Sequence, residues 1–135
     1  MPPSPTPGAT SRAVGRTINA QRARAGLSLR DFSARLSFYG LALSASTLGR
    51  IERGEVAPTV DLLTVAAFIF GVAPATLLLP PVAHENSDAE LAGTGVTDAL
   101  SVWEWITAAM PLPDPEHPDP DVRGWRYQAR PPWAL

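Results

Sequence analysis

The stretch Ser44-Ala-Ser-Thr-Leu-Gly-Arg-Ile-Glu-Arg-Gly54 decides the fold of this chain. Ser44 is a favourable helix N-cap, because its hydroxyl can accept a hydrogen bond from a backbone N–H of the first turn. Leu48 and Ile51 are three residues apart and therefore share one face of a helix. Gly54 readily adopts the left-handed conformation that ends a helix. The stretch thus predicts a short helix with one apolar face.

A second short helix is predicted just before this one. Ser28 is its N-cap, and Asp31, three residues later, completes a variant of the capping box. Its apolar stripe has helical spacing and consists of Leu29, Phe32 and Leu36. Two short helices joined by a turn have the spacing of a helix-turn-helix.

The same cap and stop signals predict an all-α domain of five helices over residues 12–80. The helices are expected at residues 12–25, 28–38, 44–53, 59–70 and 74–79. Residues 1–10 are expected to be a disordered tail, because four of the first seven residues are proline.

The chain changes character after residue 81. Residues 81–97 are expected to be a linker, and residues 98–110 an apolar helix whose wide apolar arc is buried against the five-helix body or against a second copy. Residues 111–135 are expected to be a tail that is first acidic and rich in proline and then aromatic.

Composition excludes several kinds of site. The 135 residues include no cysteine, and the two histidines are 33 positions apart, so no metal site is expected. The sequence contains no apolar run long enough to span a membrane and no signal peptide, so a cytoplasmic protein is expected. The net charge of −2 conceals an asymmetry, because residues 1–80 carry +4 and the remainder −6. Such an asymmetry indicates contact with a polyanion on one side.

In its order of motifs the chain resembles the phage-repressor/Cro (XRE) family of DNA-binding proteins. The resemblance covers residues 12–80 and implies a five-helix lambda-repressor-like fold. It rests on Arg22-Ala-Arg-Ala-Gly-Leu-Ser-Leu-Arg-Asp-Phe-Ser-Ala-Arg-Leu36, on Ser46-Thr-Leu-Gly-Arg-Ile-Glu-Arg-Gly54 and on Ala66-Ala-Phe-Ile-Phe-Gly-Val72. The turn between Leu36 and Leu48 is longer than in the phage repressors, as in XRE-type regulators of high-GC bacteria. Its Leu41 and Leu43 are expected to pack on the core.

This resemblance implies that the helix at 44–53 enters the DNA major groove while the helix beginning at Ser28 crosses the backbone. The implied base contacts are Ala45, Ser46, Gly49 and Arg50. Arg50 is the strongest of them, because a guanidinium can bond both acceptors of a guanine. Arginines and helix starts supply the candidate phosphate contacts, which are Arg12, Arg16, Ser28, Arg30, Ser44, Thr47 and Arg53. For each arginine, a merely solvated surface position is the alternative. The resemblance also implies a partly buried ion pair between Arg22 and Glu52.

These observations predict a sequence-specific transcription regulator, expected to be a repressor that binds a palindromic operator in double-stranded DNA as a homodimer. The alternative is a protein-binding adaptor or antitoxin that keeps the helix-turn-helix as a scaffold. Its partner interface would comprise Trp103, Trp105, Trp125, Tyr127 and Trp133, unless these aromatics fold back on the body. Enzymatic activity is not expected. The chain has no phosphate-binding loop and no nucleophile motif, and neither catalytic residues nor a cofactor are predicted.

Overall fold

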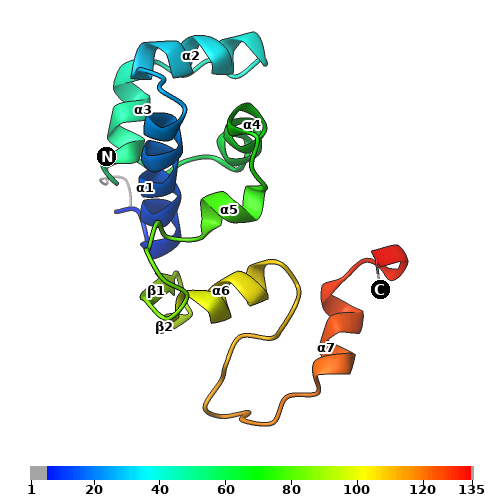
Figure 1. Ribbon diagram of the computed structural model, residues 1–135. Helices are drawn as coiled ribbons and strands as arrows, with labels where there is room; N and C mark the ends of the chain where they lie inside the picture. The colour runs from blue at the N-terminus through cyan, green and yellow to red at the C-terminus, as the bar shows by residue number, and fades with distance from the viewer. Residues whose placement is uncertain (1–5, 135) are drawn as a thin grey trace, which may run out of the picture.

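The computed structural model describes residues 6–134 and shows a mostly helical protein, which confirms the coarse fold class (Figure 1). Residues 1–5 of the predicted tail lie outside the described residues. The first helices are α1 (Ala9–Arg24), α2 (Leu29–Phe38), α3 (Ala45–Glu52), α4 (Val60–Phe70) and α5 (Pro74–Leu78). Helix α1 starts three residues before the predicted position, so residues 9 and 10 are helical and do not belong to a tail.

Local side-chain chemistry starts these helices where the sequence predicts. The Ser28 hydroxyl accepts from the backbone N–H of Asp31 at 3.0 Å, and the Asp31 carboxylate accepts from the N–H of Ser28 at 3.2 Å, which completes the capping box. Ser44 caps α3 by accepting from the N–H of Thr47 at 3.1 Å. Thr59 caps α4 in the same way through Leu62.

The main core lies between these helices. Its fully buried large side chains come from all five of them and are Ile18, Phe32, Leu36, Leu48, Leu62 and Leu77. Phe32 stacks on Phe70 with the ring centroids 5.1 Å apart. Leu41 and Leu43 of the long turn pack against this core, as expected.

Gly15 allows α1 to lie very close to α3. A Cβ at this position would overlap the carbonyl oxygen of Ile51 and would lie 3.5 Å from the α-carbon of Glu52. Only a residue without a side chain fits between the two backbones. The close approach of α1 to α3 therefore requires glycine at position 15.

The expectation of a linker over residues 81–97 is wrong for its second part, because residues 88–98 form a β-hairpin. Strand β1 (Asp88–Leu91) pairs antiparallel with β2 (Gly95–Asp98) in the register Asp88 to Asp98 and Leu91 to Gly95. Ala89 and Leu91 are buried while their neighbours Asp88 and Glu90 are exposed. This alternation is the period of a half-buried strand.

The hairpin and α6 (Ala99–Ile106) form a second core with α1. This core contains Ala13 of α1 together with Ala89, Leu91, Ala99 and Val102. Two hydrogen bonds connect α1 to the hairpin turn and to the residue that follows α5. The Ala92 N–H donates to the Thr10 hydroxyl at 2.8 Å, and the Thr17 hydroxyl donates to the Leu79 carbonyl at 2.7 Å. Helix α1 thus belongs to both cores, and α6 packs against the body of the same chain.

Helix α6 ends four residues before the predicted position. Ala108 has a φ of +59°, which breaks the helix, and two arginines bind the carbonyl groups that follow the break. Nε of Arg130 donates to the Ala108 carbonyl and Nε of Arg126 to the Ala109 carbonyl, each at 2.8 Å. Both arginines come from the last part of the chain, which contains α7 (Val122–Ala129) and the 3-10 helix η1 (Pro132–Ala134). The predicted tail at 111–135 therefore includes a helix, on the opposite side of the molecule from α3 (Figure 1).

Candidate nucleic-acid interface

Helix α3 and its C-cap residue Arg53 present an exposed column of polar side chains. Ser46, Arg50 and Arg53 are exposed and follow helical spacing, while Leu48 and Ile51 on the opposite face are buried in the core. The side chains of Arg50 and Arg53 are 55% and 61% exposed. A helix anchored by one face and polar on the other can enter a groove without losing its packing.

Gly49, one of the expected base contacts, lies between α2 and the Arg53 side chain. The residue is buried, and a Cβ there would lie 3.1 Å from Nη1 of Arg53 and 3.4 Å from Cδ1 of Leu29. Gly49 thus allows α2 to pack closely on α3 while the Arg53 guanidinium covers it. Of the other expected base contacts, Ala45 is half-buried, and Ser46 and Arg50 are exposed.

The two helix N-termini of the helix-turn-helix differ in charge. The first turn of α2 contains Asp31, whose pKa is lowered because its carboxylate accepts hydrogen bonds from the hydroxyl and N–H of Ser28. The first turn of α3 contains no acidic residue. The partial positive charge of a helix N-terminus attracts phosphate. The start of α3, with Ser44 and Thr47, therefore offers a phosphate a more favourable electrostatic environment than the start of α2 with Ser28.

Glu55 lies close to both exposed arginines of α3. Its Oε2 is 3.2 Å from Nη2 of Arg53 and 3.9 Å from Nε of Arg50. Ion pairs between exposed side chains contribute about 0 to 1 kcal/mol, whereas a bidentate contact to the correct base contributes about 1 to 3 kcal/mol. The pair with Glu55 is therefore too weak to keep Arg50 from a base.

Arg22 and Glu52 form a bidentate ion pair that joins α1 to α3. Nε and Nη2 of Arg22 each donate to the carboxylate at 2.8 Å, and Nη1 donates to the Leu27 carbonyl at 2.9 Å. The Glu52 side chain is 5% exposed, and its hydrogen bond with Arg22 raises the pKa of the guanidinium. Nδ2 of Asn19 adds a third donor to Glu52 at 2.7 Å. Asn19 was not predicted, although its position three residues before Arg22 places both on one face of α1.

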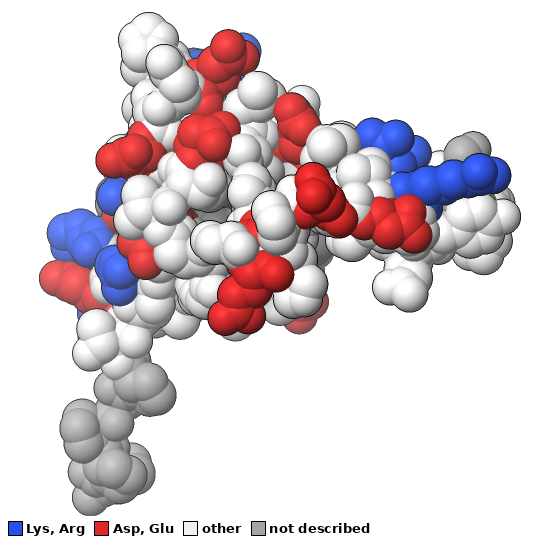
Figure 2. Space-filling view, turned by 90° about the horizontal axis from the view of Figure 1, so that it is seen from below, with Lys and Arg blue, Asp and Glu red and all other residues white. Residues whose placement is uncertain are grey.

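The remaining candidate phosphate contacts lie on the surface. Arg30 is exposed near the start of α2. Arg12 and Arg16 are exposed on α1, and Nη1 of Arg12 donates to the Pro7 carbonyl. Figure 2, seen from the hairpin end, shows acidic side chains across the middle of the face and basic side chains at two opposite edges.

The aromatic residues of the candidate partner interface lie on α6, on α7 and in η1. Trp103 and Trp105 on α6 are 36% and 37% exposed. Trp125 on α7 is half-buried, while Tyr127 and Trp133 are 67% and 87% exposed. Contacts from Arg126 and Arg130 hold α7 beside the end of α6.

Among residues 6–134, no group of three or more histidine, cysteine, aspartate or glutamate residues is arranged to hold a metal ion. None of the helices described there combines the length and the hydropathy that crossing a membrane requires.

Comparison with known proteins gives two matches. A family model described as "Helix-turn-helix domain" matches residues 13–79. Among solved structures, the DNA-binding domain of BldD is 30% identical over 51% of this chain and 93% of its own, with a TM-score of 0.42. No curated protein matches the chain.

Proposed function

The chain belongs to the XRE-like helix-turn-helix family through residues 13–79, and from this premise we propose that it is a transcription regulator that reads the DNA major groove with α3. The observation that carries the proposal is the exposed column Ser46, Arg50 and Arg53 on a helix whose opposite face is fixed in the core. In a helix-turn-helix, the second helix enters the groove and its N-terminal half reaches the base edges.

The proposed contacts divide into two classes. Arg50 reads a guanine, with Ser46 close to a neighbouring base and Ala45 suited to a thymine methyl group. Arg53, Arg30 and the start of α3 bind phosphates, which positions the helix without selecting a sequence. The ion pair between Arg22 and Glu52 fixes the angle of α3 relative to α1 and acts as a positioning element.

We further propose that the chain acts as a homodimeric repressor. A single short recognition helix reads only a few base pairs, and two copies related by a two-fold axis match a palindromic operator. Repression follows when such an operator overlaps a promoter.

The proposal is tested by fluorescence anisotropy with labelled genomic fragments, including the region upstream of the chain's own reading frame. A regulator of this kind binds one fragment far more tightly than the others. Its affinity falls steeply with salt, with a log–log slope of about −0.9 for each phosphate that it contacts. Equal, weak binding to every fragment would overturn the proposal.

A second candidate function is a protein-binding adaptor or antitoxin. The observation that favours it is α7, on which Tyr127 is 67% exposed and after which Trp133 is 87% exposed. Exposed tyrosine and tryptophan are frequent anchors of protein interfaces. An interface of this type responds only weakly to salt, so the same salt series distinguishes the two functions.

A further inference from the structure

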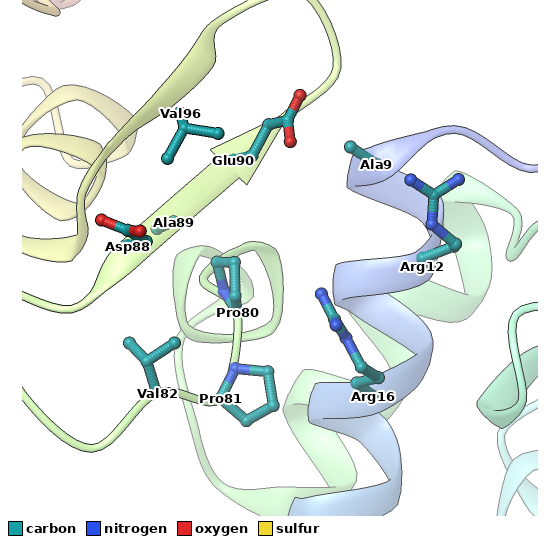
Figure 3. A pocket seen from close by; sticks show the side chains of 10 residues that line it. All are labelled: Ala9, Arg12, Arg16, Pro80, Pro81, Val82, Asp88, Ala89, Glu90 and Val96. Carbon is teal, nitrogen blue, oxygen red and sulfur yellow. The ribbon is translucent and has the colours of Figure 1, made fainter.

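A hollow of about 430 Å³ is lined by residues of α1, of the β-hairpin and of the segment that joins α5 to the hairpin. Its two charged walls have opposite signs. Arg12 and Arg16, one helical turn apart on α1, form one wall, and Asp88 and Glu90 of β1 form the other (Figure 3). The apolar lining between them consists of Pro80, Pro81, Val82, Ala89 and Val96.

The opposed charges do not neutralise each other directly. Within residues 6–134, neither arginine forms an ion pair with Asp88 or Glu90, and all four side chains belong to exposed residues. The second core fixes the position of the hairpin on α1, because Ala13 packs with Ala89 and Leu91. The hollow therefore lies at the junction between α1 and the hairpin.

The charge arrangement selects one class of ligand. An anion without a positive group would be repelled by Asp88 and Glu90, and a cation without a negative group by Arg12 and Arg16. A zwitterion satisfies both walls, because guanidinium groups bind a carboxylate and carboxylates bind an ammonium group. Pockets of about 300 to 1,000 Å³ hold small molecules, and the apolar lining suits an aliphatic body.

We propose that this hollow, which we name the junction pocket, binds a small zwitterion of the amino-acid class with an apolar side chain. Its carboxylate binds Arg12 and Arg16, and its ammonium group binds Asp88 and Glu90.

Ligand binding in the junction pocket is expected to oppose DNA binding, a step that rests on the proposed function. Both arginines are candidate phosphate contacts. The stem of Arg12 also lies beside Gly54, just after the end of α3, where a Cβ would be 3.3 Å from Cγ of Arg12. A carboxylate that holds these side chains in the pocket makes them unavailable to phosphate.

The test is a two-dimensional NMR titration of the full chain, without DNA, with each standard L-amino acid in turn. The expected result is saturable shifts at residues 12, 16 and 88–90 for at least one apolar amino acid. Its N-acetyl and methyl ester derivatives, each lacking one charge, are expected to bind at least about tenfold more weakly. Arg16→Gln and Glu90→Gln should each weaken binding similarly, while Arg24→Gln, a control outside the pocket, should leave it unchanged. No saturable shifts, or equal binding of the derivatives, would overturn the proposal.

The link to DNA is measured separately by anisotropy with and without the amino acid that binds. DNA affinity is expected to fall as the pocket fills, and unchanged affinity would refute the link. Ligand binding by a chain with no DNA affinity would refute the proposed function while leaving the junction pocket in place. DNA binding with no ligand binding would refute the junction pocket while leaving the proposed function in place.

Discussion

At the scale of single residues, Gly15 sets how closely α1 approaches α3. In an exposed helix, replacing glycine by alanine increases stability by up to about 1 kcal/mol. Here the new Cβ would overlap the Ile51 carbonyl oxygen. Gly15→Ala is therefore expected to lower the free energy of unfolding by about 1 to 3 kcal/mol, as overpacked sites do. Urea denaturation measures the change, and a gain in stability would show that the two backbones are not in close contact.

Replacing Arg22 is expected to lower the free energy of unfolding more than replacing Gly15, because Arg22 neutralises the nearly buried carboxylate of Glu52. Arg22→Met leaves Glu52 with only Asn19 as a donor, and the unpaired charge should cost about 3 to 5 kcal/mol. The double variant Arg22→Met with Glu52→Met removes the stranded charge and should recover most of that loss. If the single and double variants are equally unstable in urea, the ion pair is not the cause.

Several site residues were predictable because their signals are local or carried by the family pattern. The cap at Ser44, the exposed Arg50 and the pairing of Arg22 with Glu52 are of this kind. The burial of Gly49 was not predictable, because it depends on two long side chains, Leu29 and Arg53, whose directions no spacing rule specifies.

At the scale of elements, Asp98 starts α6 and connects the hairpin to it. Its Oδ2 accepts from the Ser101 N–H at 2.9 Å and its Oδ1 from the Ser101 hydroxyl at 2.8 Å, and these bonds lower the pKa of Asp98. A carboxyl whose pKa is lower in the folded state stabilises that state above its unfolded pKa of about 3.9, and this contribution disappears as the pH falls through the folded value.

Asp98→Asn is therefore expected to destabilise the protein at pH 7, and its difference from the wild type is expected to disappear as the pH falls through the lowered pKa of Asp98. Chemical denaturation at several pH values measures the difference between the two proteins. The control is Asp119→Asn, which removes the same charge from the exposed segment before α7. A difference that stays constant down to low pH would contradict the role of the Asp98 carboxylate.

The hairpin and the end of α6 were not predictable from local patterns. Only Ala89 and Leu91 alternate with polar residues in β1, which is too short a signal to mark a strand. Their burial depends on Ala13, more than 70 positions earlier. Likewise, the break at Ala108 is stabilised by Arg126 and Arg130, which follow a proline-rich segment. Contacts between distant segments decide both features.

At the scale of the whole molecule, the C-terminal extension is part of the folded body. Removing residues 81–135 uncovers Ala13, which is 0% exposed, and the face of Leu79 that packs on the second core. The truncated chain is expected to lose about 2 kcal/mol of stability, the value of one well-buried leucine side chain. Calorimetry measures the melting temperature, and an unchanged value would mean that the extension does not stabilise the helices before it.

The central claim is that Arg50 reads DNA sequence from α3. The most direct test compares wild type, Arg50→Ala and the charge-matched control Arg123→Ala on α7, using anisotropy with the best-bound fragment and with one scrambled copy. Arg50→Ala should lose about 1 to 3 kcal/mol of discrimination between the two fragments, while Arg123→Ala should keep it. If Arg50→Ala weakens binding to both fragments equally, Arg50 contacts phosphate only, and the account of base reading is wrong.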